Sequence, residues 1–313
     1  GITAVVGAAE ADSLRDGDVV LVDAENGEIE LDPPQDRVDL ALQRTVTLEA
    51  IRAQSSGPGR LADGHAVPLL ANIGSVDSAR EAVARGAEGV GLFRTEVLFL
   101  GAETAPSVDY QAATYREVFA QFPGQKVVVR VLDAGADKPL AFLTDAGEEN
   151  PALGRRGLRA LAAHESVLRD QLTALAQAAH DSDALVQVMA PMVSTAAEAL
   201  YFRDLAHELG MAVAGVMVEV PSCAIMADHV ARNADFMSIG TNDLTQYVFA
   251  ADRLLGTVAA FQNPWHPAVL RLIEIVGTAG AAYDVPVGIC GEAAADPLLA
   301  LVLVGLGATS LSM

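Results

Sequence analysis

Polar and reactive side chains follow several apolar segments of this 313-residue sequence, at the point where each segment ends. Arginines stand in FRTE and VVVRVLD, carboxylates in VEV and GTND, and a thiol in GICGE. These groups are Arg94, Arg130, Glu219, Asp243 and Cys290. Because a hydrophobic core requires none of them, their repeated placement indicates one shared site.

The side chains at these segment ends have complementary chemistry. Guanidinium groups bind phosphate and carboxylate through rigid pairs of donors, and Arg156 and Arg253 add two more from loops. Glu219 and Asp243 offer hard oxygen ligands for Mg²⁺, and Asn242 can donate to a phosphate oxygen. The cysteine of GICGE is a candidate proton donor or nucleophile. Together these groups indicate phosphoryl transfer combined with proton transfer at carbon.

Eight apolar segments follow one another from residue 65 onward, separated by alanine-rich stretches typical of helices. Because nearly continuous apolar strands are buried on both faces, they predict a parallel sheet with crossover helices in an α/β fold. Eight strands in about 250 residues match a (β/α)8 TIM barrel, whose active site lies at the C-terminal ends of the strands. We expect strands within 66–73, 89–96, 126–133, 184–193, 214–220, 235–242, 286–292 and 308–313.

The first 64 residues have a different pattern. An apolar run, the turn signal Asn26-Gly27 and an alternating stretch predict a β-hairpin. The spacing of apolar residues over 35–55 predicts a connecting helix, which ends at SSGPG. We therefore predict the edge of another domain at 1–33, a helical linker at 34–64 and the barrel at 65–313.

The composition argues against several classes of protein. The 20 basic and 41 acidic side chains give a net charge of 20 − 41 = −21, and sequence-independent binding to nucleic acid or to an anionic membrane needs a basic surface. The sequence lacks an apolar stretch of about 18 residues, and its start lacks the basic region of a signal peptide. Two cysteines fit a reducing compartment. We expect a cytoplasmic protein with no nucleic-acid or membrane partner.

Seven sequence blocks resemble, in order, the successive motifs of the phosphoenolpyruvate-utilising enzymes. Within that family they are most similar to Enzyme I of the bacterial sugar phosphotransferase system. The opening GITAVVG and GDVVLVDAENGEIELDP resembles the end of that family's swivelling phosphohistidine domain. The blocks are GVGLFRTEVLFL, VVVRVLDAGADKPL, ENPALGRRGLR, GVMVEVPSCAIMAD, FMSIGTNDLTQYVFAADR, NPWHPAVLRLI and VGICGEAAADP.

The resemblance implies the phosphoenolpyruvate-binding half of a phosphotransferase. Such a protein moves the phosphoryl group of phosphoenolpyruvate, with Mg²⁺, onto a histidine of its own N-terminal half and on to the carrier HPr, releasing pyruvate for sugar uptake. None of the six histidines lies in the family's Gly-Gly-x-x-Ser-His type of motif, so we expect this fragment to be incomplete for net transfer. The resemblance also implies a homodimer and a final helix beyond residue 313, which leaves dimerisation of the fragment open.

Four arginines match positions that hold the substrate in the family. Arg94 and Arg130 would grip the phosphate. Arg253, in AADR, would help to bind it, and Arg156, in GRRGLR, would join the clamp on phosphate or carboxylate.

The remaining matched positions would serve the metal and the proton. Glu219 and Asp243 would ligate Mg²⁺, with Asp243 and Asn242 also at the substrate. Cys290 would protonate the enolate carbon as pyruvate forms, since an acid near that carbon makes transfer effectively one-way.

Other polar and sulfur-containing residues have structural interpretations. We expect Glu96 to anchor Arg94 or a neighbouring arginine and not to bind metal. We expect Cys223 to be buried, and Trp265 to pack or to contact a second subunit. Gln187 and Met189 are placed at the end of the fourth barrel strand. The family's Gly-Gly-Asp-Lys reads GADK at 135–138, where Lys138 is an equal candidate for a salt bridge and for substrate contact.

Other functions remain open from the sequence alone. The chain also fits the nitrogen-related paralogue of Enzyme I, whose sensor domain would lie elsewhere. The matching domain of pyruvate phosphate dikinase or phosphoenolpyruvate synthase would require an ATP-binding domain. A third alternative is a non-catalytic module that senses phosphoenolpyruvate. Replacing Cys290 by Ala separates an enzyme from a sensor, because only the enzyme needs the thiol.

Overall fold

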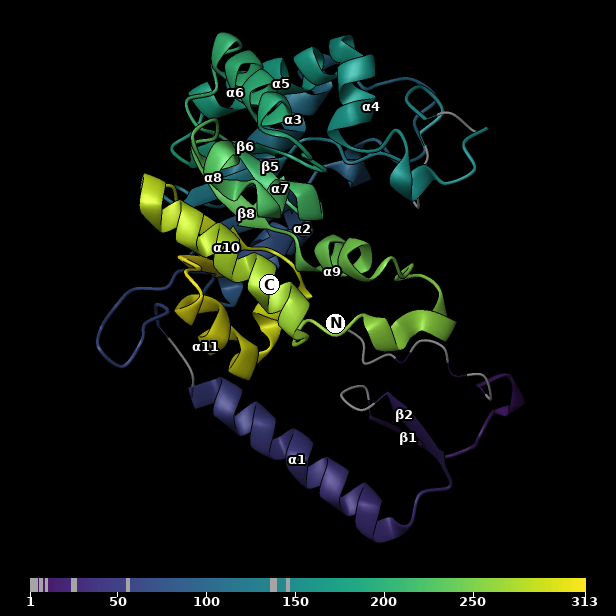
Figure 1. Ribbon diagram of the computed structural model, residues 1–313. Helices are drawn as coiled ribbons and strands as arrows, with labels where there is room; N and C mark the ends of the chain where they lie inside the picture. Colours follow the sequence, from purple (N-terminus) through teal and green to yellow (C-terminus); the bar gives the residue numbers. More distant parts are fainter. Residues whose placement is uncertain are drawn as a thin grey trace. The chain divides into compact units, whose positions relative to one another are not determined.

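The computed structural model (Figure 1) describes residues 5, 8, 11–23, 27–54, 57–135, 140–144 and 147–313, without the side chains of 48, 49 and 51–54. The chain divides into two compact units. The larger unit comprises Pro58–Val248 and Pro264–Met313, and the smaller comprises Gly1–Gly57 and Phe249–Asn263. In the part of the chain that is described, no helix combines the length and the apolar character needed to cross a membrane.

The larger unit is built on a closed barrel of eight parallel strands, as the apolar segments predict. Consecutive strands are neighbours around the barrel, and Leu311 closes it by pairing with Leu69 on one side and Ile289 on the other. Each strand lies within its predicted segment. The strands are β3 (Leu69–Ile73), β4 (Gly89–Arg94), β5 (Lys126–Arg130), β6 (Leu185–Ala190), β7 (Ala214–Val218), β8 (Met237–Ile239), β9 (Val287–Ile289) and β10 (Ser310–Ser312).

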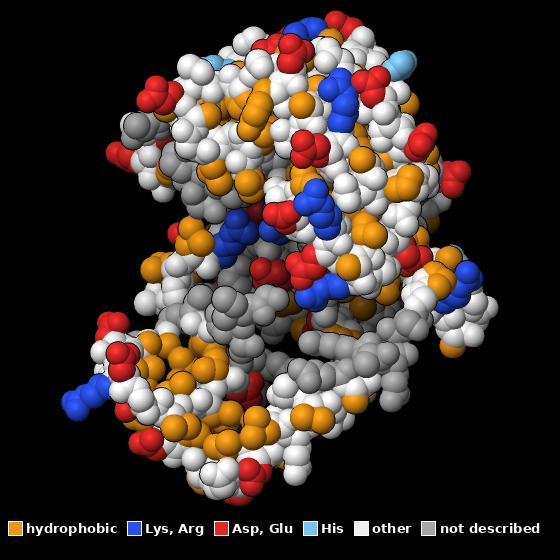
Figure 2. Space-filling model, turned by 180° about the vertical axis from the view of Figure 1, so that it is seen from behind, with side chains coloured by type: hydrophobic (Ala, Val, Ile, Leu, Met, Phe, Trp, Pro, Cys, Tyr) orange, Lys and Arg blue, Asp and Glu red, His pale blue; other side chains and the backbone are white. Residues whose placement is uncertain are grey.

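Helices surround this barrel (Figure 1). Ser75 and Thr195 begin two of them with capping boxes, which satisfy backbone N–H groups that lack partners in the first turn. Acidic and basic side chains are interspersed on the solvent-facing side of the barrel unit (Figure 2). The helices are α2 (Val76–Ala84), α3 (Val108–Phe119), α4 (Leu158–Ala163), α5 (Glu165–His180), α6 (Ala196–Glu208), α7 (Pro221–Ile225), α8 (Ala227–Ala231), α9 (Thr241–Phe249), α10 (Pro267–Tyr283) and α11 (Pro297–Gly305).

A buried polar network fixes the loops that follow β4 and β5. The Gln171 side chain, on α5, accepts from the Leu132 N–H at 2.9 Å and donates to the Thr95 hydroxyl at 3.1 Å. Thr95 in turn donates to the Arg130 carbonyl at 3.0 Å. Because buried polar groups are costly unless they are paired, this network holds the ends of both strands in one arrangement.

The smaller unit contains the predicted hairpin and helix. Strands β1 (Val20–Asp23) and β2 (Glu28–Leu31) pair antiparallel, and α1 spans Gln35–Gln54. Asn26, in the predicted turn, lies outside the described residues. The segment 249–263 belongs to this unit although it lies within the predicted barrel range. The predicted boundaries at 33 and 64 stay predictions.

Candidate active site

Arg130 lies at the C-terminal end of β5, where the sequence places it, and its guanidinium is buried with only 5% of the residue exposed. Its Nη2 donates to Glu96 Oε1 at 2.6 Å, and its Nη1 lies 3.3 Å from Asp133 Oδ2. Glu96 therefore anchors an arginine, as expected. Among the described residues, Arg130 Nε has no hydrogen-bond partner. A buried donor without a partner is costly, so this N–H offers a ready contact for a phosphate oxygen.

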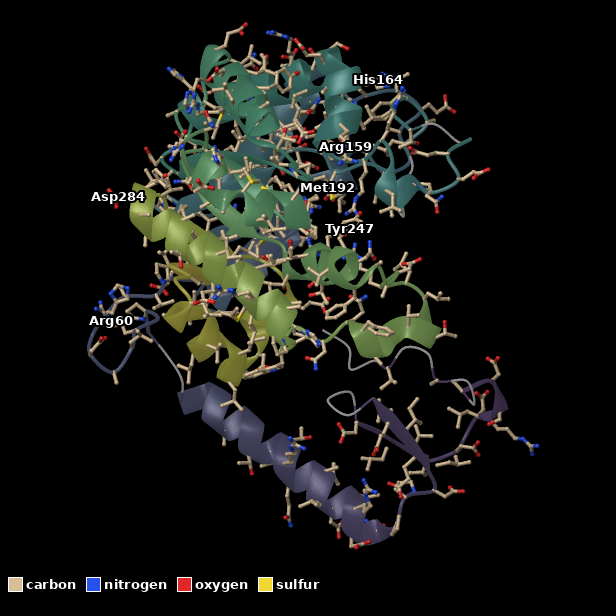
Figure 3. The ribbon with its side chains drawn as sticks, viewed as in Figure 1. Arg60, Arg159, His164, Met192, Tyr247 and Asp284 are labelled. Carbon is tan, nitrogen blue, oxygen red and sulfur yellow. The ribbon has the colours of Figure 1, made fainter. Side chains whose placement is uncertain are left out.

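Arg156 extends the same buried chain of charges. Its Nη2 lies 3.1 Å from Asp133 Oδ2, and its Nη1 lies 2.8 Å from Asp243 Oδ1 and 3.1 Å from the Tyr247 hydroxyl. Tyr247 lies on α9 (Figure 3). Burial alone would lower the pKa of Arg156, but the two aspartates hold that pKa above its ordinary value. Arg156 thus organises the acidic residues, and Asp133 joins it to Arg130.

Glu219 follows β7 and is almost fully buried. Its Oε1 accepts from the Met192 N–H at 2.7 Å, and Met192 has a left-handed φ of 57°. Backbone strain of this kind is typical of functional sites. Burial, followed by the nearby charges of Asp243 and Asp133, raises the pKa of Glu219 to about 8. Burial and the two nearby carboxylates thus disfavour the negative charge of Glu219, which a bound cation would stabilise.

The donor set fits Mg²⁺ held jointly by protein and substrate. Mg²⁺ usually binds to one or two carboxylates and completes its octahedron with phosphate oxygens and water. Within the described ranges, no group of three or more His, Cys, Asp or Glu side chains forms a complete metal site. Glu219 and Asp243 would supply the protein ligands, and Asp243 would share its charge between the metal and Arg156.

Asn242, in the first turn of α9, and Cys290, directly after β9, lie at the same end of the barrel. The Asn242 Oδ1 accepts from the Glu292 N–H at 3.0 Å, which fixes the loop after β9 and leaves the amide NH₂ as a donor. Cys290 is buried, and its Sγ donates to the Ile239 carbonyl at 3.5 Å. Burial raises the pKa of Cys290 to about 11. The thiol is therefore protonated at neutral pH, which favours a proton donor over a nucleophile.

Arg94 ends β4 and pairs in register with Arg130 on β5. Unlike Arg130, its side chain is exposed. Its positive charge and that of Arg130 act on Cys290, where both oppose the rise in the thiol pKa. The structure thus brings two arginines, two carboxylates and a thiol to one end of the barrel. Of these five side chains, that of Arg94 is exposed and the other four are buried.

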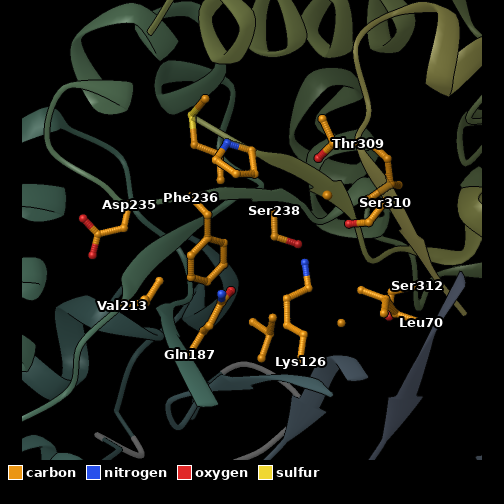
Figure 4. Close-up of a pocket in the computed structure, with 16 residues that line it drawn as sticks. Leu70, Lys126, Gln187, Val213, Asp235, Phe236, Ser238, Thr309, Ser310 and Ser312 are labelled. Atoms are coloured by element: carbon orange, nitrogen blue, oxygen red, sulfur yellow. The ribbon is translucent and has the colours of Figure 1, made fainter. Parts of the chain in front are cut away.

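The remaining predicted residues have separate outcomes. Arg253 belongs to the smaller unit, so its part in the clamp stays a prediction. Asp137 and Lys138 lie outside the described residues. The placement of Gln187 at the strand end is wrong: it lines a cavity with Lys126, the first residue of β5, at the opposite end of the barrel (Figure 4).

Several residues that organise the site were missed or understood only in part. Asp133, the last residue of VVVRVLD, bridges two arginines, a role that its sequence context does not reveal. Gln171 and Met192 carry no local signal of their roles, because one acts from a helix and the other through its backbone. Cys223 is buried, as expected. The Trp265 Nε1 donates to Asp296 at 2.8 Å, which is a packing contact within the barrel unit.

Comparison with known proteins agrees with this geometry. Residues 49–313 match the family model described as "PEP-utilising enzyme, PEP-binding domain". The chain belongs to the phosphoenolpyruvate-utilising enzymes. It is 52% identical over 315 residues to the phosphoenolpyruvate-protein phosphotransferase of Streptomyces coelicolor, covering 100% of this chain and 57% of that protein. The resemblance stated from the motifs is thereby confirmed.

More distant members of the family extend the match. The phosphoenolpyruvate-protein phosphotransferase of Bacillus subtilis is 38% identical, with 100% of this chain and 57% of that protein covered. A multiphosphoryl transfer protein of Xanthomonas campestris is 39% identical, with 100% of this chain and 38% of that protein covered. The chain thus spans little more than half of the length of the first two of these relatives.

A solved structure supports the barrel architecture only. An HpcH/HpaI aldolase/citrate lyase family protein of Burkholderia cenocepacia superposes with a TM-score of 0.50 at 17% identity, covering 80% of this chain and 89% of that one. At this identity the likeness concerns the fold.

Proposed function

We propose that this domain binds phosphoenolpyruvate with Mg²⁺ and donates its phosphoryl group to a histidine in the N-terminal half of a phosphoenolpyruvate-protein phosphotransferase. The observation that carries the proposal is the buried, alternating series of Glu96, Arg130, Asp133, Arg156 and Asp243. It ends at a carboxylate that lies within electrostatic reach of Glu219. Such a series presents positive and negative groups at fixed positions to a small, highly charged substrate.

The arginines would hold the phosphoryl group. Arg130 offers its unpartnered Nε, and the exposed Arg94 can close over the substrate from the neighbouring strand. The amide of Asn242 would add a donor, and Arg156 and Arg253 would complete the clamp. Because the buried Arg130 and Arg156 are held by ion pairs before the substrate arrives, they would stabilise charge on the transferred group without reorganisation.

Glu219 and Asp243 would hold the metal. Mg²⁺, when bound, neutralises phosphate charge during transfer. Its positive charge would also lower the pKa of Glu219, so that the carboxylate would be ionised in the loaded site.

Cys290 would supply the proton that completes the reaction. When the phosphoryl group leaves, the remaining enolate needs a proton on its methylene carbon to become pyruvate. A thiol with a pKa raised to about 11 holds its proton at neutral pH and can deliver it to the more basic carbon. Protonation would remove the enolate and draw the phosphoryl transfer forward.

The wider role follows from the relatives. We infer that the phosphoryl group passes on to HPr, in support of sugar uptake. We also infer a homodimer located in the cytoplasm. The basis is that proteins named phosphoenolpyruvate-protein phosphotransferase match the whole of this chain.

The two buried cysteines provide a matched test in the full-length phosphotransferase. Cys290→Ala should retain Mg²⁺-dependent binding of phosphoenolpyruvate and lose pyruvate formation by about 10²–10⁴-fold, the usual contribution of a positioned acid. Cys223→Ala should retain both activities, since Cys223 is a buried residue of α7 that is given no proton to donate in the proposed reaction. Pyruvate formation by Cys290→Ala at the wild-type rate would contradict the proposal and favour a sensor.

A further inference from the structure

A cavity of about 80 Å³ lies inside the barrel at its N-terminal end, opposite the candidate active site (Figure 4). It is lined by first residues of strands, including Lys126 and Ser310, and by residues that precede strands, such as Thr309. Its polar lining is unusual for a barrel interior, which is normally filled by branched apolar side chains. The ammonium of Lys126 extends into it, directed toward the Ser238 hydroxyl in Figure 4.

Ser238 connects this cavity to the candidate active site. Its side chain lines the cavity and lies near enough to the Cys290 thiol to lower the pKa of that thiol. Cys290 itself packs in an apolar cluster with Leu92, Val128 and Met217. Ser238 therefore provides a polar connection between the thiol and the opposite end of the barrel.

Lys126 is suited to exchange protons at the far end of this connection. Burial lowers the pKa of its ammonium, and desolvation is the cause of that shift. Asp235 is the carboxylate that lines the same cavity. Its oxygen is already engaged by the Ala214 N–H at 2.8 Å and by His207 at 2.9 Å, so these contacts compete with any ion pair to Lys126. An ammonium that is partly desolvated gives up a proton more readily than one in water.

Gly288 keeps the space between the hydroxyls open. A Cβ at this position would lie 3.1 Å from Ser310 Oγ and 3.7 Å from Ser238 Oγ. Its backbone does not adopt the left-handed conformation that would require glycine. Glycine is therefore needed here because it leaves space, and not because of its backbone freedom. An alanine would narrow the cavity beside Ser238 without straining the backbone.

We propose that Lys126 and Ser238 return a proton to Cys290 through the barrel interior after each turnover. This inference rests on the proposed function, because it assumes that Cys290 gives its proton to the enolate carbon. The thiolate that remains takes the hydroxyl proton of Ser238, while Ser238 takes a proton from the Lys126 ammonium, directly or through one water in the cavity. The neutral Lys126 amine then regains a proton from solvent at the N-terminal face. Both residues would act on the reaction only through Cys290.

The test compares the first turnover with the following ones in the full-length phosphotransferase supplied with phosphoenolpyruvate, Mg²⁺ and excess HPr. Because the thiol starts protonated, Ser238→Ala and Lys126→Met should form the first pyruvate at the wild-type rate. Later turnovers should slow by about tenfold or more, as expected for a lost proton-transfer group. Gly288→Ala should slow the later turnovers in the same direction, and Ser310→Ala should not, because Ser310 lines the cavity without a bond to the thiol.

Three results would overturn the inference or its premise. Wild-type rates in all turnovers of Ser238→Ala and Lys126→Met would exclude a return path through the interior. An equal loss in the first and later turnovers would show that Ser238 only orients the thiol. Full activity of Cys290→Ala would instead refute the proposed function, which separates that failure from failure of the proton path.

Discussion

The buried carboxylate of Glu219 makes the metal-free protein sensitive to pH, and Glu219→Gln should remove that sensitivity. The substitution keeps the shape of the side chain and an oxygen that can accept from the Met192 N–H, a bond of 2.7 Å in the structure. It removes only the group that titrates. Any difference between variant and wild type therefore reports the cost of the buried charge.

The magnitude follows from the pKa of Glu219, which is about 8 in the folded protein against 4.5 for the ordinary side chain. Because the folded-state pKa is raised, stability is fully present below pH 4.5 and is lost as pH rises through 8. At about 1.4 kcal/mol per pKa unit, this difference sets an upper limit of about 5 kcal/mol. Glu219→Gln should match wild type near the lower end of this range and exceed its stability above the upper end.

Urea unfolding at a series of pH values, without Mg²⁺, measures this effect. The free energy of unfolding of the wild type should fall between the two pKa values relative to that of Glu219→Gln. The exposed Glu117→Gln is the control and should keep the wild-type dependence. With Mg²⁺ at high pH, the wild type should gain stability and Glu219→Gln should gain much less. Parallel pH profiles for wild type and Glu219→Gln would refute the reasoning.

Three further predictions follow from single contacts at the strand ends. Gly240→Ala places a Cβ 2.9 Å from the Glu219 carboxylate. It should weaken the thermal stabilisation by Mg²⁺ and lower the free energy of unfolding by about 1–3 kcal/mol. An unchanged response to Mg²⁺ would contradict this prediction. Arg130→Met leaves the buried Glu96 without its arginine and removes one of the two arginines that pair with Asp133, so urea unfolding at pH 7 should show a loss of about 3–5 kcal/mol. A neutral effect would be inconsistent with this. Burial raises the pKa of Cys290 to about 11 and that of Cys223 to about 12. Both thiols should therefore resist alkylation by iodoacetamide at pH 8 until the protein unfolds. Rapid labelling of the native protein would contradict this prediction.

The barrel was predictable because its signals are local. Each strand is a short apolar segment, and the polar residue that ends it is adjacent in sequence, as at Arg130 and Glu219. The partner of Glu96 was predictable as an arginine for the same reason. Distances between these ends were not predictable, because they depend on closure of the barrel across residues as distant as Leu69 and Leu311.

The errors and omissions have a common physical origin. Alternation along a strand indicates which side chains point inward, but not how deep in the barrel they lie, so Gln187 was assigned to the wrong end. Arg156 was predicted as a substrate clamp, whereas its guanidinium also holds two aspartates together. The contribution of Gln171 depends on a helix packed beside two loops, which no short sequence pattern encodes.

The most direct test of the central claim is calorimetric titration of the protein with phosphoenolpyruvate, with and without Mg²⁺, for wild type and Arg94→Met. Arg94 is exposed, so its removal should leave the fold intact. Loss of a charged hydrogen bond, about 1.5–3 kcal/mol, predicts binding weakened by about 10–150-fold. We predict that wild type binds phosphoenolpyruvate only with Mg²⁺ and that Arg94→Met binds it much more weakly. Equal binding by both proteins, with or without Mg²⁺, would contradict the account.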